Sequence, residues 1–196
     1  MPRASAVDAA FTAEKVLSAA SQCFAAYGFH ATSVEQIARS AGVTRGAVYH
    51  HFDDKVGLLR AVVRAGHRRV ASHIVDNAEV ARGDILALLR AGCHAFVDGI
   101  TQDEAARVIL VDGPAVLGWT EWRALDAENS MQELHEAIAL LAPAADVEAL
   151  TRLLSGAMNE GVLWLIERPD DPDARAAVHR TLDQLVNAVG RPSTRP

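Results

Sequence analysis

The chain has 196 residues, half of them apolar and 22% charged, with a formal net charge of −6, which excludes disordered and collagen-like chains and allows a buried core. The longest apolar runs, residues 108–111 and 162–166, are too short to span a bilayer, and the first residues lack the apolar part of a secretion signal. Two cysteines, Cys23 and Cys93, do not make a disulfide framework, so we expect buried free thiols. Together these features predict a cytoplasmic protein without membrane contact.

The first predicted helix begins near Thr12 and ends at Gly28. Apolar residues recur at i, i+4, i+7, i+8 and i+11 from Val16 to Tyr27, which is the spacing of one helix face. Thr12 is a suitable N-cap, and Gly28 is of the residue type that commonly terminates a helix.

Two short helices follow, separated by a tight turn. Ser33 with Gln36 three residues later is a capping box, which predicts a helix start, and Gly42 ends this helix. Thr44 is the expected N-cap of a third helix that extends to about His51. The two helices and the turn predict a helix-turn-helix.

The remaining predicted helices account for most of the chain. A fourth helix opens at Asp53 or Asp54 and buries an apolar stripe from Leu58 to Val70. A further capping box lies at Thr101–Glu104, and caps and prolines place the later helices at residues 84–100, 115–141, 146–167 and 171–189. Without strand alternation or an internal repeat, the sequence predicts an all-α fold of about nine helices, with a frayed tail at 191–196.

Residues 44–51, the predicted third helix, have the size and residue types of a helix that reads DNA. At 1.5 Å per residue this helix is about 12 Å long, close to the width of a B-DNA major groove. Gly46 and Ala47 are small enough for the backbone to approach the bases, and Arg45 can pair with a guanine edge or a phosphate. Gly42 suits the preceding turn because glycine tolerates a positive φ.

Groups that can bind phosphate surround this helix. They are the side chains of Thr44, Tyr49, His50, His51 and Lys55, and the helix N-terminus at Ser33. Residues 1–76 carry 9 basic and 6 acidic residues, whereas residues 77–196 carry 10 and 19, which favours an anionic partner for the N-terminal part. The alternatives are charges scattered on solvated helix faces, and Tyr and His side chains that lie over a core edge.

The segment GVTRGAVYHHFDDKVGL, residues 42–58, resembles the DNA-binding signature of TetR/AcrR-type transcriptional regulators. Residues 24–29 and 32–38 are also similar to that family, and the resemblance covers about residues 11–65. Val56 departs from the family pattern, which usually has an acidic residue there, and the missing charge at a helix N-terminus amounts to about 0.5 kcal/mol. The resemblance implies base contacts from Arg45 and Ala47 and backbone contacts from Ser33, Thr44, Tyr49, His51 and Lys55.

The same resemblance implies how the chain is organised. A helix-turn-helix DNA-binding domain at 1–55 and a connecting helix at 56–76 precede a ligand-binding and dimerisation domain at 77–190. Members of the family form homodimers, bind palindromic operators in double-stranded DNA, usually repress transcription, and are released by a ligand in the C-terminal domain. The inducer, the operator and the regulated genes do not follow from the sequence, and repression is not separated from activation.

The last two long predicted helices match the dimerising pair of the family. Small residues at 155–157 and 161 allow close helix packing, and the final helix carries a continuous apolar stripe. We expect a four-helix interface between two copies, formed by Leu154, Ala157, Gly161, Leu165, Val178, Leu182, Leu185 and Val189.

Apolar and aromatic residues of the C-terminal part predict a pocket for an unidentified small apolar or aromatic effector. They are Leu89, Cys93, Phe96, Ile109, Trp119, Trp122, Met158 and Trp164. Each tryptophan also fits an ordinary core position. Cys93 and His94 are adjacent rather than spaced like zinc ligands, so we expect no metal and no cofactor.

Two other classes of function are alternatives. A helical enzyme lacks support, because the chain has no Gly-rich phosphate loop, GxSxG or HExxH motif. A DNA-binding regulator without a small ligand, controlled by its abundance or by a protein partner, fits the same features. A cavity beneath Trp119 and Trp122 would separate this alternative from a ligand-responsive regulator.

Overall fold

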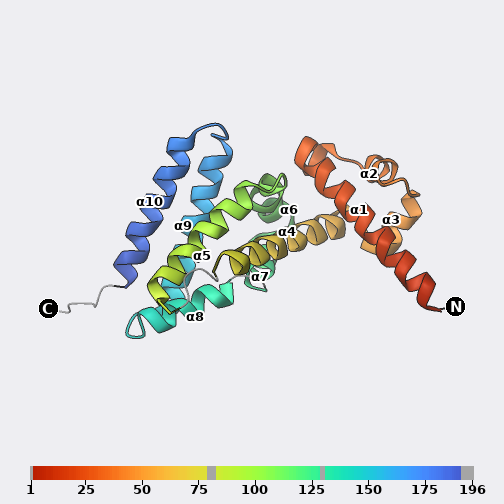
Figure 1. The fold of residues 1–196 in the computed structure, drawn as a ribbon. Helices are drawn as coiled ribbons and strands as arrows, with labels where there is room; N and C mark the ends of the chain where they lie inside the picture. Colours follow the sequence, from red (N-terminus) through yellow and green to blue (C-terminus); the bar gives the residue numbers. More distant parts are fainter. Residues whose placement is uncertain (1, 79–82, 129–130, 191–196) are drawn as a thin grey trace. The chain divides into compact units, whose positions relative to one another are not determined.

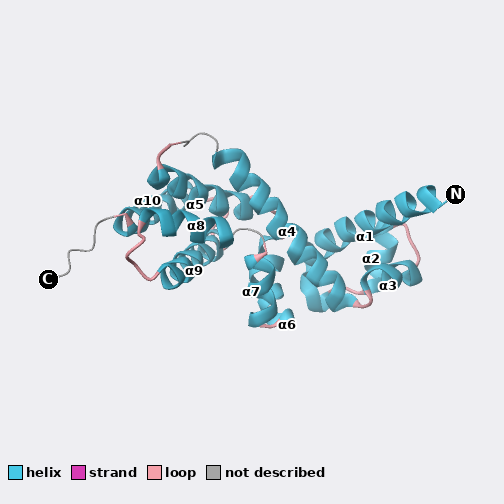
Figure 2. Cartoon of the chain, turned by 90° about the horizontal axis from the view of Figure 1, so that it is seen from below, coloured by secondary structure: helices cyan, strands magenta, loops and turns pink. Residues whose placement is uncertain are grey.

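The computed structural model describes residues 2–78, 83–128 and 131–190, and these residues are helical almost throughout (Figure 1). The helices are α1 (Pro2–Ala31), α2 (Val34–Ala41), α3 (Arg45–Phe52), α4 (Lys55–Ala78), α5 (Ile85–Thr101), the π-helix η2 (Val108–Asp112), α6 (Gly113–Leu117), α7 (Trp119–Ala127), α8 (Met131–Leu141), α9 (Val147–Ile166) and α10 (Pro172–Val189). No strand occurs in these described ranges (Figure 2), which confirms the predicted all-α fold. None of the described helices is long and apolar enough to cross a membrane.

The chain divides into two compact units. The first comprises Met1–Gly66 and Glu104–Arg123, and the second comprises His67–Asp103 and Ala124–Pro196. The predicted functional division assigned residues 104–123 to the C-terminal part, whereas they pack here with the N-terminal helices, because η2 lies against α1.

Apolar side chains from α1, α2, α4 and η2 hold the first unit together. The most deeply buried are Val16, Phe24, Ile37, Leu58, Leu59, Val62, Val63, Val108 and Ile109. Full burial of one such side chain stabilises a fold by about 1.5–3 kcal/mol. Tyr27, which follows the apolar spacing of α1, is nevertheless 61% exposed, and the chain leaves the helical path at the next residue, Gly28 (φ 76°, ψ 163°).

Polar contacts also tie residues 104–123 to the rest of the first unit. The backbone N–H of Phe29 donates a hydrogen bond to Oδ2 of Asp112 at 3.0 Å. Arg60 of α4 forms an ion pair with Glu121 of α7, and this hydrogen-bonded contact lowers the pKa of the Glu121 carboxyl. The C-terminal end of α1 is therefore linked to η2 through the Asp112 side chain, and α4 to α7 through the Arg60–Glu121 pair.

In the second unit, α5 packs against α8, α9 and α10, and α9 also packs against α8 and α10 (Figure 1). The buried core side chains of these helices include Leu89, Phe96, Val97, Ile100, Ile138, Leu154, Met158, Val162, Leu165, Leu182 and Val186. Cys93 is also buried, and desolvation raises the pKa of its thiol to about 12. Cys23 is buried in the first unit, so both cysteines are free buried thiols, as predicted.

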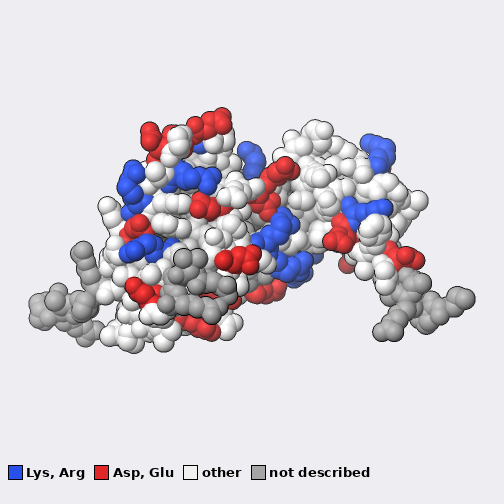
Figure 3. Space-filling view, viewed as in Figure 1, with Lys and Arg blue, Asp and Glu red and all other residues white. Residues whose placement is uncertain are grey.

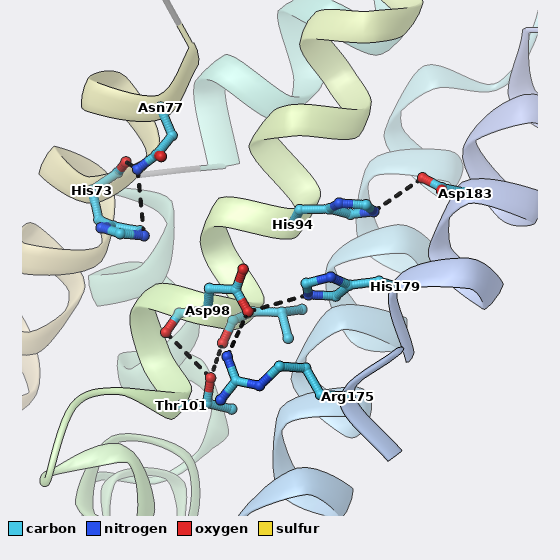
Figure 4. A network of polar contacts seen from close by, with 9 residues as sticks. His73, Asn77, His94, Asp98, Thr101, Arg175, His179 and Asp183 are labelled. Atoms are coloured by element: carbon cyan, nitrogen blue, oxygen red, sulfur yellow. Dashed lines mark hydrogen bonds and ion pairs between the residues drawn. The ribbon is translucent and has the colours of Figure 1, made fainter. Parts of the chain in front are cut away.

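A polar network lies between α5 and α10 (Figure 4). The imidazole rings of His94 and His179 stack with their centroids 4.3 Å apart. Nε2 of His94 lies 3.0 Å from Oδ1 of Asp183, and Nε2 of His179 lies 3.2 Å from Oδ1 of Asp98, which also accepts a hydrogen bond from Arg175 at 2.8 Å. Burial lowers the pKa of His179, and His94 and Arg175 act in the same direction.

Two predicted helix starts are wrong. α1 begins at Pro2 rather than at Thr12, whose hydroxyl donates to the backbone carbonyl of Asp8 at 2.8 Å within the helix. Thr101 closes α5 instead of opening a helix, and its hydroxyl donates to the carbonyl of Val97 at 2.7 Å. Threonine bonds either to a following N–H, as a cap, or to a preceding carbonyl, and the spacing alone does not distinguish the two.

The helix predicted over residues 115–141 is interrupted in the structure. Gly118 has φ 82°, which no helix accommodates, and it separates α6 from α7. The caps predicted at Ser33, Thr44, Asp84 and Asp171 are confirmed, since their side-chain oxygens accept hydrogen bonds from the first turns of their helices. Asp146 caps α9 in the same way. The tail predicted at residues 191–196 lies outside the described residues.

Candidate nucleic-acid interface

Helices α2 and α3 form a helix-turn-helix whose two N-termini are both capped by side chains. Oγ of Ser33 accepts a hydrogen bond from the N–H of Gln36 at 3.1 Å, and Oγ1 of Thr44 accepts one from the N–H of Ala47 at 3.2 Å. Between the helices, Gly42 has left-handed backbone angles, φ 67° and ψ 33°, that glycine adopts without strain. A cap of this type stabilises a helix by about 1 kcal/mol, so local bonds define where α3 begins.

One side chain anchors α3 in the first unit, and the others remain accessible. Val48 is buried, and in α2 the small Ala38 and the larger Ile37 are buried as well. Among the predicted DNA contacts, exposed residues are Ser33, Thr44, Arg45, Gly46 and His50, and half-buried residues are Ala47, Tyr49, His51 and Lys55. None of the predicted contact residues is buried in the protein itself, so each has surface available for a partner.

Arg45 is held by two neighbours on the protein surface. Its Nη1 lies 2.6 Å from Oε1 of Glu35 on α2, and its Nη2 donates to the hydroxyl of Tyr49 at 3.1 Å. The hydrogen bond to Tyr49 and the charge of Glu35 raise the pKa of the guanidinium. Since the side chain of Arg45 is 59% exposed, these contacts orient it without shielding it from solvent.

Lys55 lies against the end of α1. Its Nζ is 4.3 Å from the centroid of the Phe29 ring and 3.5 Å from the carbonyl oxygen of His30. Desolvation lowers the pKa of the ammonium group. The aromatic ring and the carbonyl hold the cation near the start of α4, where it adjoins the C-terminus of α3.

Two charged residues of α2 join the predicted set. Glu35 of α2 forms an ion pair with Arg45 of α3, and no short-range sequence pattern predicts this pair. Arg39 is exposed in the last turn of α2, and its place on the polar face of a capped helix is the signal that identifies it. Basic and acidic side chains are interspersed on the face drawn in Figure 3, so overall charge does not by itself mark this interface.

The second unit contains a cavity of about 200 Å³. Residues of α4, α5, α7, α8 and α9 line it, and four of the predicted pocket residues are among them, Leu89, Cys93, Phe96 and Met158. The first three follow each other on one face of α5, at the helical spacing on which their prediction was based.

The other four predicted pocket residues do not line this cavity. Trp122 is buried in the first unit, where its indole N–H donates to the carbonyl of Ile109 at 2.7 Å. Trp119 is 65% exposed, with its ring centroid 5.1 Å from that of Trp122. Trp164 lies on the surface of α9, with the guanidinium of Arg168 4.8 Å from its ring centroid. A buried indole N–H needs a hydrogen-bond acceptor, and the carbonyl of Ile109 provides one. Trp122 is therefore a core residue of the first unit.

Three of the predicted interface residues belong to the core of the second unit. Leu154, Leu165 and Leu182 are at most 5% exposed, because these faces of α9 and α10 pack against neighbouring helices of the same chain. Gly161 also allows α9 and α10 of the same chain to pack closely, since a Cβ atom there would lie 3.0 Å from Cγ1 of Val178 on α10.

The remaining predicted interface residues retain accessible surface. Leu185 is exposed, and Ala157, Val178 and Val189 are half-buried. Leu153, which was not predicted, is 72% exposed and lies one helical turn before Ala157 on α9. Apolar side chains of α9 and α10 therefore remain uncovered in the single chain.

Two families match the chain, and together they cover most of it. Residues 16–62 match the family described as "Bacterial regulatory proteins, tetR family", and residues 86–189 match "Tetracyclin repressor-like, C-terminal domain". The first match contains α2, α3 and the predicted DNA contacts, and the second contains most of the helices around the cavity.

Individual relatives agree with this assignment. The chain is 29% identical over 195 residues to the HTH-type transcriptional repressor Rv1474c of Mycobacterium tuberculosis, covering 97% of this chain and 100% of that protein. It is 35% identical over 89 residues to the repressor AcnR of Corynebacterium diphtheriae, covering 44% of this chain and 46% of that protein.

Solved structures show the same fold and complete the comparison. A TetR-family transcriptional regulator from Pectobacterium atrosepticum superposes with a TM-score of 0.73 at 29% identity, covering 93% of this chain and 96% of that one. The fatty acid degradation regulator FadR from Bacillus halodurans has a TM-score of 0.75 at 18% identity, covering 89% and 93%. The chain belongs to the TetR family of bacterial transcriptional regulators, which are DNA-binding proteins and not enzymes.

Proposed function

We propose that this protein represses transcription by binding a palindromic operator as a homodimer, and that a small apolar or aromatic molecule releases it. The observation that carries the proposal is the capped α2–turn–α3 segment, which presents Thr44, Arg45, Gly46 and His50 on its exposed side. The similarity to proteins described as transcriptional repressors favours repression over activation.

In this proposal α3 enters the major groove. Arg45 and Ala47 face the bases, and Gly46 allows the backbone to approach closely. Phosphates contact Ser33, Thr44, Tyr49, His50, His51 and Lys55, which position the helix without reading sequence. The orientation of Arg45 by Tyr49 supports this assignment, because an oriented guanidinium loses less freedom when it binds a guanine.

The dimer supplies two such helices. Two recognition helices related by a two-fold axis occupy successive major grooves about 34–36 Å apart, which requires a palindromic operator. The uncovered apolar side chains of α9 and α10, including Leu153 and Leu185, support a second copy as the partner of this surface.

The cavity supplies the site for the effector. α4 is one continuous helix that starts directly after α3 and carries Ile74 and Val75 in the lining of the cavity. A ligand that displaces α4 changes the spacing of the two recognition helices, and a coupling of about 1–3 kcal/mol changes affinity 5–150-fold. We assign residues 1–55 to DNA binding, 56–76 to the connection, and 77–190 to ligand binding and dimerisation.

The decisive experiment is selection of bound duplexes from random DNA by the purified full chain at low salt, followed by sedimentation of the complex. We expect enrichment of an inverted repeat and two protein chains per duplex. A selection that enriches no duplex would contradict DNA reading by α3, and one chain per duplex at micromolar concentration would contradict the dimer.

A further inference from the structure

We propose that the cavity of the second unit binds a compact, mostly apolar molecule with one hydrogen-bond donor, an amine or a hydroxyl, and that Asp126 receives this donor. The inference rests on the proposed function, since it gives the effector a chemical class. It excludes carboxylates and other anions as effectors.

The size and lining of the cavity define the apolar part of the ligand. An apolar cavity of about 150 Å³ accommodates benzene, so a cavity of about 200 Å³ accommodates a ring with a short substituent. The walls are the side chains of Leu88, Leu89, Phe96, Leu134, Ala137 and Met158. Contact with these groups favours an aromatic or aliphatic ring over a polar molecule.

Two buried polar side chains interrupt this apolar lining. Asp126, in the last turn of α7, is 2% exposed, and Ser155 of α9 is 3% exposed. In an environment with little water, a hydrogen bond to a carboxyl group is stronger than at the surface, and a hydrogen bond to a charged group contributes about 1.5–3 kcal/mol. A ligand with a donor in the right place therefore gains affinity that a hydrocarbon of the same shape does not.

The charges at the cavity select the sign of the ligand. Asp126 and Glu133 both line it, and among the described lining residues none is Lys or Arg. A carboxylate ligand would bring a third acidic group to a lining whose described residues include no lysine or arginine. An ammonium or hydroxyl group meets acceptors instead.

Asp126 also connects the ligand to α4. Nδ1 of His67, on α4, lies 3.7 Å from Oδ1 of Asp126, and both side chains are 2% exposed. Ile74 and Val75, both about two turns further along α4, line the cavity directly. A donor that binds Asp126 therefore acts on the same carboxyl group that faces His67, which places α4 next to both ends of the ligand.

The test is a matched series of probes titrated into the full chain by calorimetry: toluene, benzyl alcohol, benzylamine and benzoate. They share a ring and differ in the polar substituent. We expect benzylamine and benzyl alcohol to bind at least about tenfold more tightly than toluene, which corresponds to the lower end for a hydrogen bond to a charged group, and benzoate to bind more weakly than toluene. Benzoate binding as tightly as benzylamine, or no binding of any probe at millimolar concentration, would overturn the proposal.

Variants locate the binding. Asp126→Asn keeps the shape but removes the charge, and we expect benzylamine to lose its advantage over toluene while toluene binding persists, which shows that the cavity is intact. Glu136→Gln, an exposed position on the same helix as Glu133 that does not line the cavity, is the matched control and should preserve the order of the probes. Ala137→Phe fills the cavity and should abolish binding of all probes. An unchanged benzylamine preference in Asp126→Asn would assign the donor to another acceptor and refute the role of Asp126.

Release of operator DNA is measured separately, by fluorescence anisotropy with and without benzylamine. Binding with the expected preference but without DNA release supports the ligand class and contradicts ligand-responsive repression. DNA release by benzoate and not by benzylamine contradicts the ligand class and supports ligand-responsive repression.

Discussion

The α2–α3 segment and the α5–α10 contact use charged side chains in opposite settings. Arg45 pairs with Glu35 where both side chains are open to water, with exposures of 59% and 46%. Asp98, between α5 and α10, is 28% exposed and holds both an arginine and a histidine. An exposed ion pair contributes little to stability and exchanges partners readily, whereas a half-buried hydrogen-bonded charge stabilises its surroundings. DNA affinity and folding stability should therefore depend on different charged residues.

Replacement of Arg45 should give the largest change in binding. We expect Arg45→Ala to weaken binding to the selected operator by about 1–3 kcal/mol, because a bidentate contact to a guanine is lost. The free energy of unfolding should be nearly unchanged, since the side chain is exposed. Anisotropy titrations with operator and random duplexes measure the effect. An equal loss on both duplexes would indicate that Arg45 binds phosphate rather than a base.

Asp98→Asn should lower folding stability and leave DNA affinity nearly unchanged. The change weakens the contacts of Asp98 with Arg175 and His179, and we expect the free energy of unfolding to fall by about 1–2 kcal/mol. Operator affinity at 25 °C should remain within about twofold of the unchanged protein, provided that the variant is folded. Urea denaturation gives the first quantity and anisotropy the second. A variant that keeps its stability but loses DNA binding would contradict the expectation that charges between α5 and α10 serve stability and not DNA affinity.

Lys55 separates phosphate binding from base reading. We expect Lys55→Ala to weaken binding to operator and random DNA alike, and to reduce the slope of log K against log salt concentration by about one unit. The same substitution at the exposed Lys15 of α1, which lies over the ring of Phe11, is a control for the loss of one positive charge. A slope that stays the same in Lys55→Ala would exclude a phosphate contact.

Glu35→Gln should strengthen DNA binding slightly. Glu35 competes with DNA for Arg45 and adds a negative charge beside the proposed phosphate contacts. Since exposed ion pairs are worth about 0–1 kcal/mol, we expect an increase in affinity of a few-fold at low salt that disappears at high salt. Weaker binding would show that Glu35 is needed to orient Arg45.

The stacked histidines should make stability depend weakly on pH. Burial, together with His94 and Arg175, lowers the pKa of His179 in the folded chain below the value of about 6.5 for a solvated histidine, so the unfolded chain takes up the proton first. The contribution of His179 is fully present above about pH 6.5 and is lost as the pH falls towards the lower, folded-state pKa. We expect His179→Gln to flatten the decrease in unfolding free energy between about pH 7 and pH 5.5. Identical pH profiles of the two proteins would contradict this origin.

Local signals predicted the helix-turn-helix well. The capping oxygens of Ser33 and Thr44 and the positive φ of Gly42 act within four residues, so their effect is readable along the chain. Local signals were less reliable for Thr12 and Thr101, because a threonine hydroxyl has both a forward and a backward partner within the same distance.

The cavity and the surface of α9 and α10 depended on contacts between distant residues. Leu89, Cys93 and Phe96, which the spacing along α5 places on one helix face, line the same cavity in the structure. Spacing along the later helices did not show that the indole N–H of Trp122 bonds to the carbonyl of Ile109, or that Leu154 faces the interior. A helix that is apolar on several sides fits more than one orientation.

The amino-acid sequence alone determined the class of fold, the caps at which α2 and α3 begin, and the residues that α3 exposes, because each of these follows from near neighbours along the chain. Only the tertiary structure decided which apolar side chains surround the cavity, that Asp126 lies buried there opposite His67, and that Glu35 holds Arg45. These contacts depend on how helices pack across many residues of separation, where the hydrophobic effect is non-directional and periodicity allows several arrangements.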